Sequence, residues 1–422
     1  MHKEMRRVTK NGIEIFDYKN PSVHGFHISL FLRAGSIYED TSGITHFLEH
    51  AAIRNVDYVM NDGLYSLLDK HGIEFNASTF SEMVQFYVSG SSPSFDIAAS
   101  VITTLLSPII LPPAEVKTES DRIKAEIREG DDRTSLTAFT GNIVHEGTSL
   151  SRSITGTLGS VSKITGKALE EYRRSVMTGE NIFFYVTGSY TEENLKFLAE
   201  KIEEYTVPSG TMRENIAPVC HKFGCRDGKV HIKNADFTML RFSFDMDMTK
   251  MTMAETDLLY DMLLGGYNSK FFIEMSEKRG LFYDISGSSE RYKNIGTLAF
   301  SYEVRGGSVY DAVEITLGIL RDFKEGLPTE DSMMKAGYVD NAYLLYDDPR
   351  ELNFTFAYDN HIMNSGYKTV EERAERYKSI TPQRIKEVAQ ELFRPENLTL
   401  TLKGNKKKID ISKLEEIIAE KL

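Results

Sequence analysis

The spacing of hydrophobic and polar positions along the 422-residue chain alternates between two periods. Runs rich in apolar and β-favouring residues predict strands, whereas stretches with apolar residues three and four apart predict helices. Strands are expected at 12–17, 24–33, 73–80, 83–90, 181–188, 229–234, 237–245, 282–289, 296–305 and 397–403. Helices are expected after Thr41-Ser42 and at 62–71, 95–106, 113–129, 133–147, 167–177, 191–205, 252–264, 268–279, 308–324, 329–346, 349–364, 369–378, 382–393 and 410–421.

The order of these elements suggests a duplication. Each half runs through paired strands, a helix, more strands and then several helices, although no repeat is visible in the residues themselves. A chain of this length is too long for one core, and the Pro- and Gly-containing stretch 206–224 is typical of a linker. We therefore expect an α+β protein with two similar domains, 1–205 and 225–422, each an antiparallel-rich sheet packed with several helices.

Composition narrows the possible partners. The formal net charge is −12 and the pI is near 5.5, which argues against a nucleic-acid partner. No run of 18 apolar residues exists, so no membrane span is expected. The first residues are basic without an apolar segment behind them, which predicts no secretory signal and a cytoplasmic protein.

Only two cysteines occur, Cys220 and Cys225, and His221 lies beside the first. Three soft ligands are one short of a structural zinc site, and no fourth lies nearby. We expect two reduced thiols in the linker, and a local disulfide remains an alternative.

The strongest chemical signal is the stretch His46-Phe47-Leu48-Glu49-His50. Two histidines four apart on a helix project from one face, so both imidazoles can reach a single ion. Glu49 lies three residues after His46 on the same side, where a carboxylate can accept a proton from water at the metal. This order, H-x-x-E-H, is the inverted zinc-protease motif. Because a helix can also contain these three residues by chance, the motif predicts a zinc site only if further ligands accompany it.

A catalytic zinc site with two histidines needs a third protein ligand. The predicted helix 113–129 offers four candidates, Glu115, Glu119, Glu126 and Glu129. Glu119 and Glu126 are seven apart, two turns along one face, so both can point to the same place. The alternative is an ordinary solvated helix face with pairs of opposite charge.

Together these residues resemble the M16 zinc metallopeptidases of the single-half-chain type. The resemblance rests on H-x-x-E-H followed by two glutamates seven apart on a later helix. It implies that His46, His50 and Glu126 bind Zn²⁺. It also implies that Glu49 is the general base and that Glu119 is an additional active-site glutamate.

The stretch Gly72–Thr79 resembles the strand with which that family pairs its substrate, and so places Asn76 and Ala77 at the substrate backbone. An exposed edge strand can accept a peptide as one more strand, which gives affinity with little sequence selectivity. A plain hairpin strand is the alternative.

In the second half, 264–270 and 277–283 resemble the family's glycine-rich segment and the element after it. The glycines are not a phosphate loop, because no Gly-Lys-Ser/Thr follows at the required spacing. By the resemblance, Tyr283 donates to the reacting carbonyl together with an arginine seven residues earlier, but position 276 is serine. Lys278 or Arg279 could supply the cation, or a related partner subunit with an intact Arg/Tyr pair could complete the site.

The predicted function is that of a zinc-dependent endopeptidase for short or unfolded polypeptides. The resemblance implies a homodimer, or a heterodimer with a related subunit, that encloses the substrate in a chamber. Two alternatives remain: a non-catalytic scaffold subunit, and a metal-dependent hydrolase that acts on something other than peptides. The complete set of metal residues favours the enzyme over the scaffold, and the Asn76-Ala77 strand favours a polypeptide substrate.

Overall fold

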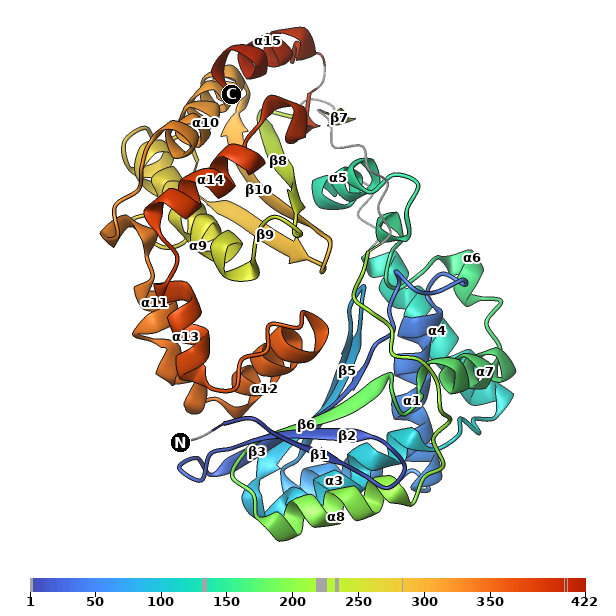
Figure 1. Ribbon diagram of the computed structural model, residues 1–422. Helices are drawn as coiled ribbons and strands as arrows, with labels where there is room; N and C mark the ends of the chain where they lie inside the picture. Colours follow the sequence, from blue (N-terminus) through green and yellow to red (C-terminus); the bar gives the residue numbers. More distant parts are fainter. Residues whose placement is uncertain are drawn as a thin grey trace. The chain divides into compact units, whose positions relative to one another are not determined.

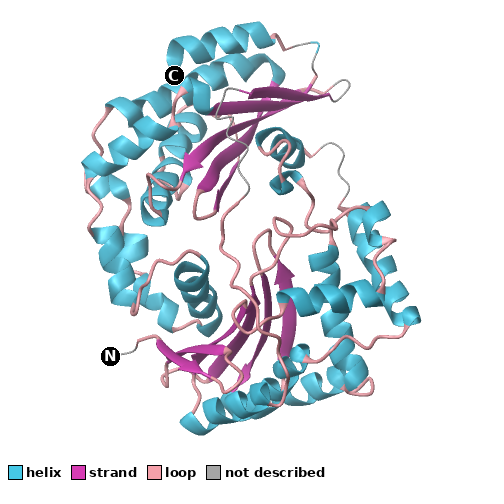
Figure 2. Cartoon of the chain, turned by 45° about the vertical axis from the view of Figure 1, so that its right-hand side comes forward, coloured by secondary structure: helices cyan, strands magenta, loops and turns pink. Residues whose placement is uncertain are grey.

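The computed structural model describes residues 3–130, 135–217, 226–231 (backbone only), 235–282, 284–405, 407 and 409–422. Within them the chain forms two compact units. Unit 1 comprises 1–131, 152–215 and 342–373, and unit 2 comprises 132–151, 216–341 and 374–422. Both units contain a sheet with helices on its two faces (Figures 1 and 2).

The sheet of unit 1 has six strands. Their order is β1 (Met5–Val8), β2 (Glu14–Lys19), β6 (Ile182–Gly188), β3 (Gly25–Leu32), β5 (Val84–Ser91) and β4 (Glu74–Thr79). Only β2 and β6 run parallel, and the other neighbours are antiparallel. In this register Ile28 at the centre pairs with Val88 on one side and Val186 on the other.

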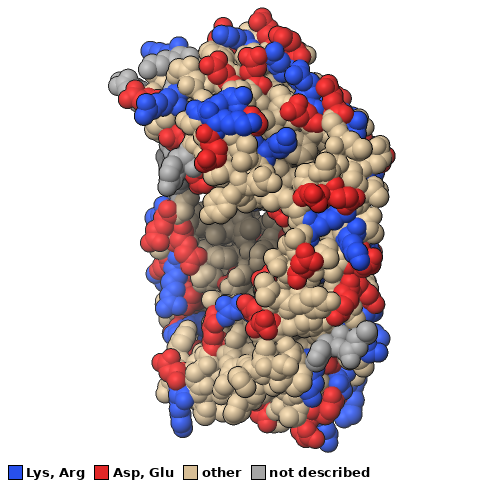
Figure 3. Space-filling view, turned by 90° about the vertical axis from the view of Figure 1, so that its left-hand side faces the viewer, with Lys and Arg blue, Asp and Glu red and all other residues tan. Residues whose placement is uncertain are grey.

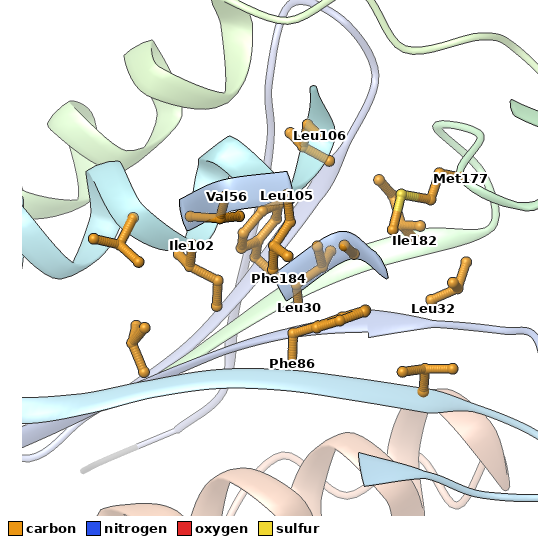
Figure 4. Packing of buried hydrophobic residues seen from close by; sticks show 14 of the residues in the cluster. Leu30, Leu32, Val56, Phe86, Ile102, Leu105, Leu106, Met177, Ile182 and Phe184 are labelled. Atoms are coloured by element: carbon orange, nitrogen blue, oxygen red, sulfur yellow. The ribbon is translucent and has the colours of Figure 1, made fainter. Parts of the chain in front are cut away.

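One face of this sheet carries the core of unit 1. Leu30, Phe86 and Phe184, from three neighbouring strands, are fully buried against Val56 of the first helix and Ile102 of the third (Figure 4). Period-two alternation in the strands and the apolar stripes of the helices produce this layer. The helices of unit 1 are α1 (Ile44–Val59), α2 (Leu64–His71), α3 (Phe95–Thr103), α4 (Pro113–Glu129), α6 (Leu158–Val161), α7 (Gly166–Val176), α8 (Glu192–Glu203), α12 (Pro349–Ala357) and part of α13 (Val370–Lys378).

The opposite face of the same sheet is covered by α12, although α12 comes from the second half of the chain (Figure 1). The Asn353 amide, fully buried, donates to the carbonyl of Tyr185 at 2.9 Å. Phe356 packs edge-on against Tyr18, with ring centroids 5.2 Å apart.

Unit 2 contains a five-stranded sheet. Its order is β7 (Arg226–His231), β11 (Leu398–Gly404), β8 (Phe237–Asp247), β10 (Ile295–Arg305) and β9 (Ile285–Arg291). Its helices are α5 (Leu136–Val144), α9 (Met253–Leu264), α10 (Val309–Glu325), α11 (Ala336–Val339), α14 (Pro382–Leu392) and α15 (Ile411–Lys421). In unit 2, α5 corresponds to α12 of unit 1, because it comes from the other half of the chain and packs on the sheet. The Thr140 hydroxyl of α5 lies 2.6 Å from that of Thr401 in β11.

The two sheets confirm the expected duplication. To compare the sheets, we count five strands along the chain in each half, starting at β2 in unit 1 and at β7 in unit 2. Apart from β1, the strands then lie side by side in the same order in both sheets: first, fifth, second, fourth and third. In both, the first and fifth strands are the parallel pair. The α+β class with two similar domains is therefore correct.

The division of the chain differs from the one expected, because each half contributes a helix to the other unit. Continuous domains at 1–205 and 225–422 do not describe the contacts of 132–151 and 342–373. An apolar helix face shows that a helix packs against a sheet, but not which sheet. Residues 206–217 of the expected linker contain no helix or strand. The remainder of that linker, with Cys220 and His221, and the adjoining Cys225 lie outside the described residues.

Two local predictions were wrong. The strand β1 was missed, and the single helix expected at 329–346 consists of the short turns Asp331–Met333, Ala336–Val339 and Ala342–Tyr346. Met334 interrupts them with a left-handed backbone, φ 54°. Leu344 in the last turn stays 61% exposed, so no continuous helical face is buried.

No helix in the described parts of the chain is both long and apolar enough to cross a membrane. On the face shown in Figure 3, acidic and basic side chains are interspersed, and neither sign forms an extended patch.

Candidate metal centre

The start of α1 is fixed by a buried carboxylate. Glu39, 3% exposed, accepts hydrogen bonds from the amides of Gly43 at 2.6 Å and Thr45 at 3.1 Å. These amides would otherwise lack partners at the helix N-terminus, where negative charge is also favoured. Glu39 therefore holds the first turn of the helix in which the two histidines lie.

The next turns of α1 have an apolar face and a polar face. Phe47 and Leu48 are fully buried in the core of unit 1, whereas His46 and His50 lie on the other side with ring centroids 4.7 Å apart. Their side chains are 13% and 19% exposed. The helical period thus converts the motif into a half-buried imidazole pair.

The helix α4 brings two carboxylates to this pair. Glu126 Oε2 lies 3.7 Å from His46 Nε2, and Glu126 Oε1 lies 3.5 Å from His50 Nε2. Glu119, 2% exposed, places Oε2 3.5 Å from His50 Nδ1 and accepts a hydrogen bond from Arg122 at 2.8 Å. The predicted face of helix 113–129 therefore does meet the histidines.

These distances fit a bound zinc ion. Zinc holds nitrogen and oxygen ligands at about 2.0–2.2 Å in a tetrahedron, which separates neighbouring ligand atoms by roughly 3.4 Å. One ligand atom from each of His46, His50 and Glu126 can be chosen so that all three lie within 4.8 Å of one another. The gaps to Glu126 are longer than usual hydrogen bonds and close to that ligand spacing. Two imidazoles and one carboxylate are a donor set that zinc prefers, and three protein ligands leave a position for water.

The protonation of His46 also suits this role. Burial, with a smaller contribution from His50, lowers the pKa of His46 to about 4, so its imidazole is neutral at pH 7. Burial opposes charge on His50 too, but the neighbouring carboxylates of Glu119 and Glu126 outweigh it and raise its pKa. Glu119 faces Nδ1 of His50 and can accept its proton while Nε2 binds a metal, an arrangement that orients a ligand histidine.

Glu49 lies beside the ligands. Its side chain is buried, and one carboxylate oxygen, Oε2, accepts a short hydrogen bond from the Thr79 hydroxyl. Burial raises the pKa of Glu49, and the hydrogen bond from Thr79 opposes this effect. A buried carboxylate with a raised pKa is suited to accept a proton and return it.

The hydrogen bond from Thr79 also places β4 next to the centre. Asn76 and Ala77 lie in this strand, in register with Tyr87 and Phe86 of β5. β4 is the last strand of the described sheet, so its second edge has no neighbouring strand there. Asn76 is exposed, and its Oδ1 accepts the Ala77 amide proton at 2.8 Å.

The structure describes only some of the site residues predicted in the second half of the chain. Tyr283 lies outside the described residues. Ser276 is half-buried in η4 (Phe272–Glu277), a π-helix, and Lys278 and Arg279 both pair with Glu274, at 2.6 and 2.8 Å. Both cations are therefore already paired. A cation that replaced an arginine at position 276 would need to be available to the substrate instead.

Two residues at this centre were missed in the sequence. Thr79 acts through one side-chain hydrogen bond, and the Glu39 carboxylate accepts two from backbone amides. A polar residue at a strand end, or in a loop before a helix, has no periodic pattern that would have marked either one.

Comparisons with known proteins point to one family. The family description "Insulinase (Peptidase family M16)" matches residues 17–158, and "Peptidase M16 inactive domain" matches 163–336. An uncharacterized zinc protease of Rickettsia felis is 23% identical over 312 residues, 72% of this chain and 74% of that protein. The mitochondrial-processing peptidase subunit beta of Saccharomyces cerevisiae is 24% identical over 220 residues, 50% of this chain and 48% of that protein.

Among solved structures, a peptidase M16 inactive domain from Pseudomonas fluorescens has the same fold, with a TM-score of 0.83. It is 13% identical, and the match covers 95% of this chain and 98% of that one. The two family descriptions together span most of the sequence, and the metal centre lies within the first of them. The chain therefore belongs to peptidase family M16.

Proposed function

We propose that this chain is a zinc-dependent endopeptidase that hydrolyses short or unfolded polypeptides. The observation that carries the proposal is the convergence of His46, His50 and Glu126 on one point, with Glu49 buried beside them. Zinc in this site would polarise the scissile carbonyl and lower the pKa of the attacking water towards about 7.

The chain's own residues supply the remaining steps. Glu49 accepts the proton of the attacking water and later donates it to the leaving amine. Glu119 orients His50 through Nδ1 and contributes negative charge behind the ligands. The contact between Thr79 and Glu49 ties the base to the edge strand along which the peptide would lie.

The edge strand supports the proposed substrate class. Main-chain pairing with β4 requires an extended backbone, which short or unfolded polypeptides present and a folded protein does not. Because main-chain hydrogen bonds read little sequence, this mode fits broad selectivity.

We predict that N76A raises the KM for an unfolded quenched peptide by roughly tenfold, the effect of losing one or two net hydrogen bonds. The matched control is S78A, because Ser78 is exposed on the same face of β4. KM and kcat should be measured for both variants. An unchanged KM for N76A would remove this residue from substrate binding.

We also propose that full activity needs a second subunit that is related to this chain and carries the arginine missing at position 276. Ser276 in place of an arginine and the pairing of Lys278 and Arg279 with Glu274 support this. A similar relative is named as a subunit, and the second matched description is that of an inactive domain.

The expected result is that the purified chain binds zinc but cleaves peptides far below the usual kcat of about 10 s⁻¹. Activity should rise when a related subunit with the Arg/Tyr pair is added. Size-exclusion chromatography with light scattering gives the oligomeric state of each sample. Turnover at usual enzyme rates by the chain alone, as monomer or homodimer, would contradict the need for a related subunit. Zinc without cleavage in every combination would favour a scaffold subunit.

A further inference from the structure

The contacts between α1 and α4 continue beyond the metal ligands. The two helices lie side by side in unit 1 (Figure 1), and the order of their contacts shows that they run antiparallel. His46 faces Glu126, and His50, one turn later, faces Glu119 and Glu126. One further turn along α1, the guanidinium of Arg54 reaches the Glu115 carboxylate, with both Nε and Nη2 2.8 Å from Oε2. Residues at four-residue intervals on α1 thus contact successively earlier residues of α4.

Arg54 is itself held on α1. Its Nη1 donates to Asp57 Oδ2 at 3.1 Å, and the Asp57 side chain is only 4% exposed. The side chains of Arg54 and Glu115 are 25% and 29% exposed, so solvent screens their attraction only in part. A guanidinium fixed on one helix and bound through two nitrogens to the next restricts both distance and angle.

The neighbouring Asn55 supports the same alignment. Its amide donates to the carbonyl of Pro108 at 3.0 Å and accepts the amide proton of Ile110 at 2.9 Å. These residues belong to the segment that leads into α4. The chain is therefore attached to α1 just before α4 begins, and again at Glu115 in its first turn.

Other ion pairs of α4 cannot set this alignment. The pairs Lys117–Asp121 and Lys124–Asp121 lie within the helix, as does the pair of Glu119 with Arg122. Among the described residues, Arg54–Glu115 is the ion pair that joins α1 to α4 outside the metal centre. Apolar contacts such as that of Ile123, fully buried, keep one face of α4 on the core, but they are less directional than a hydrogen-bonded ion pair and allow small shifts along the helix axis. A shift of one residue would move α4 by about 1.5 Å and rotate it by about 100°.

We propose that Arg54, acting through Glu115, is a positioning residue that holds α4 in the register at which Glu126 meets His46 and His50. A metal site tolerates errors of only about 0.2 Å in its ligand distances, so a small loss of register weakens binding. The inference rests on the zinc site of the proposed function but not on peptidase activity.

The test is the zinc affinity of the metal-free chain, measured by competition with a chelating dye for R54M, E115Q and the double variant. Loss of an outer partner of a metal site typically costs 10–100-fold in affinity, and we expect about tenfold here. Both single changes break the contact between Arg54 and Glu115, and R54M also removes the bond to Asp57, so the double variant should be no weaker than R54M. R54K, which keeps the charge, should recover part of the affinity. The matched control is K117M, which removes an ion pair within α4.

Thermal unfolding of the same metal-free samples separates positioning from general destabilisation. R54M, which leaves the buried Asp57 without its cation, should lower Tm more than K117M, whereas E115Q and K117M should both lower Tm little and only E115Q should lose zinc affinity. If R54M cannot be purified folded, E115Q and R54K decide the question. Zinc affinity unchanged in R54M or E115Q, or additive losses in the double variant, would overturn the proposal. A wild-type chain without zinc affinity would instead overturn the proposed function and this inference with it.

Discussion

Replacing Glu49 with Gln is expected to leave zinc bound and to lower kcat by at least two orders of magnitude. General acid–base groups typically contribute about 10²–10⁴-fold to a rate, and an amide of the same shape cannot accept the proton. Glu49 is not among the three clustered ligand residues, so the metal should remain. The Thr79 hydroxyl can still donate to the amide oxygen, which keeps the side chain in place.

The measurement pairs zinc content per chain with kcat on an unfolded peptide, using whichever subunit combination is active. T79S is a useful companion because it keeps the hydroxyl and should retain most of the activity. E49Q with zinc bound and near-normal turnover would show that another group accepts the proton. If E49Q loses zinc, the role of Glu49 is tested with E49D instead, which keeps the carboxylate on a shorter side chain.

The order of strands and helices could be predicted because burial imposes a period on the residues. β3 is buried on both faces, but its apolar Ile28 and Leu30 alternate with polar residues such as Ser29, and this alternation indicates a strand. The duplication followed from element order alone. The exchange of α5 and α12 could not be predicted, because an apolar stripe does not identify the sheet that covers it.

The metal centre was largely predictable for a related reason. His46 and His50 share a face because of helical geometry, and so do Glu119 and Glu126, but their meeting depends on the packing of α1 against α4. Only the resemblance to a known family made that meeting an expectation. Thr79, Glu39 and Arg54 act through partners at other sequence distances, so only the structure reveals them.

Removing a zinc ligand should separate metal binding from folding. H50A is expected to weaken zinc affinity by more than the roughly 100-fold upper range for outer partners, because a direct ligand is lost. E119Q should stay within that range, because Glu119 is not a direct ligand and the amide oxygen of Gln can still accept a hydrogen bond from His50 Nδ1. Both variants should lose peptide cleavage in proportion to the zinc they lose at a fixed free zinc concentration.

The apo chain should nevertheless stay folded in both variants, because the core beneath the centre does not depend on the ion. Phe47 and Leu48, next to the ligands in sequence, are fully buried among apolar side chains. Zinc should therefore raise the unfolding free energy of wild type by RT ln(1 + [Zn]/Kd), a shift that H50A lacks. Circular dichroism melts with and without zinc measure this shift. An unfolded apo protein would instead show that the metal is structural. The proposal that the zinc keeps one coordination position for the attacking water would then lose its support.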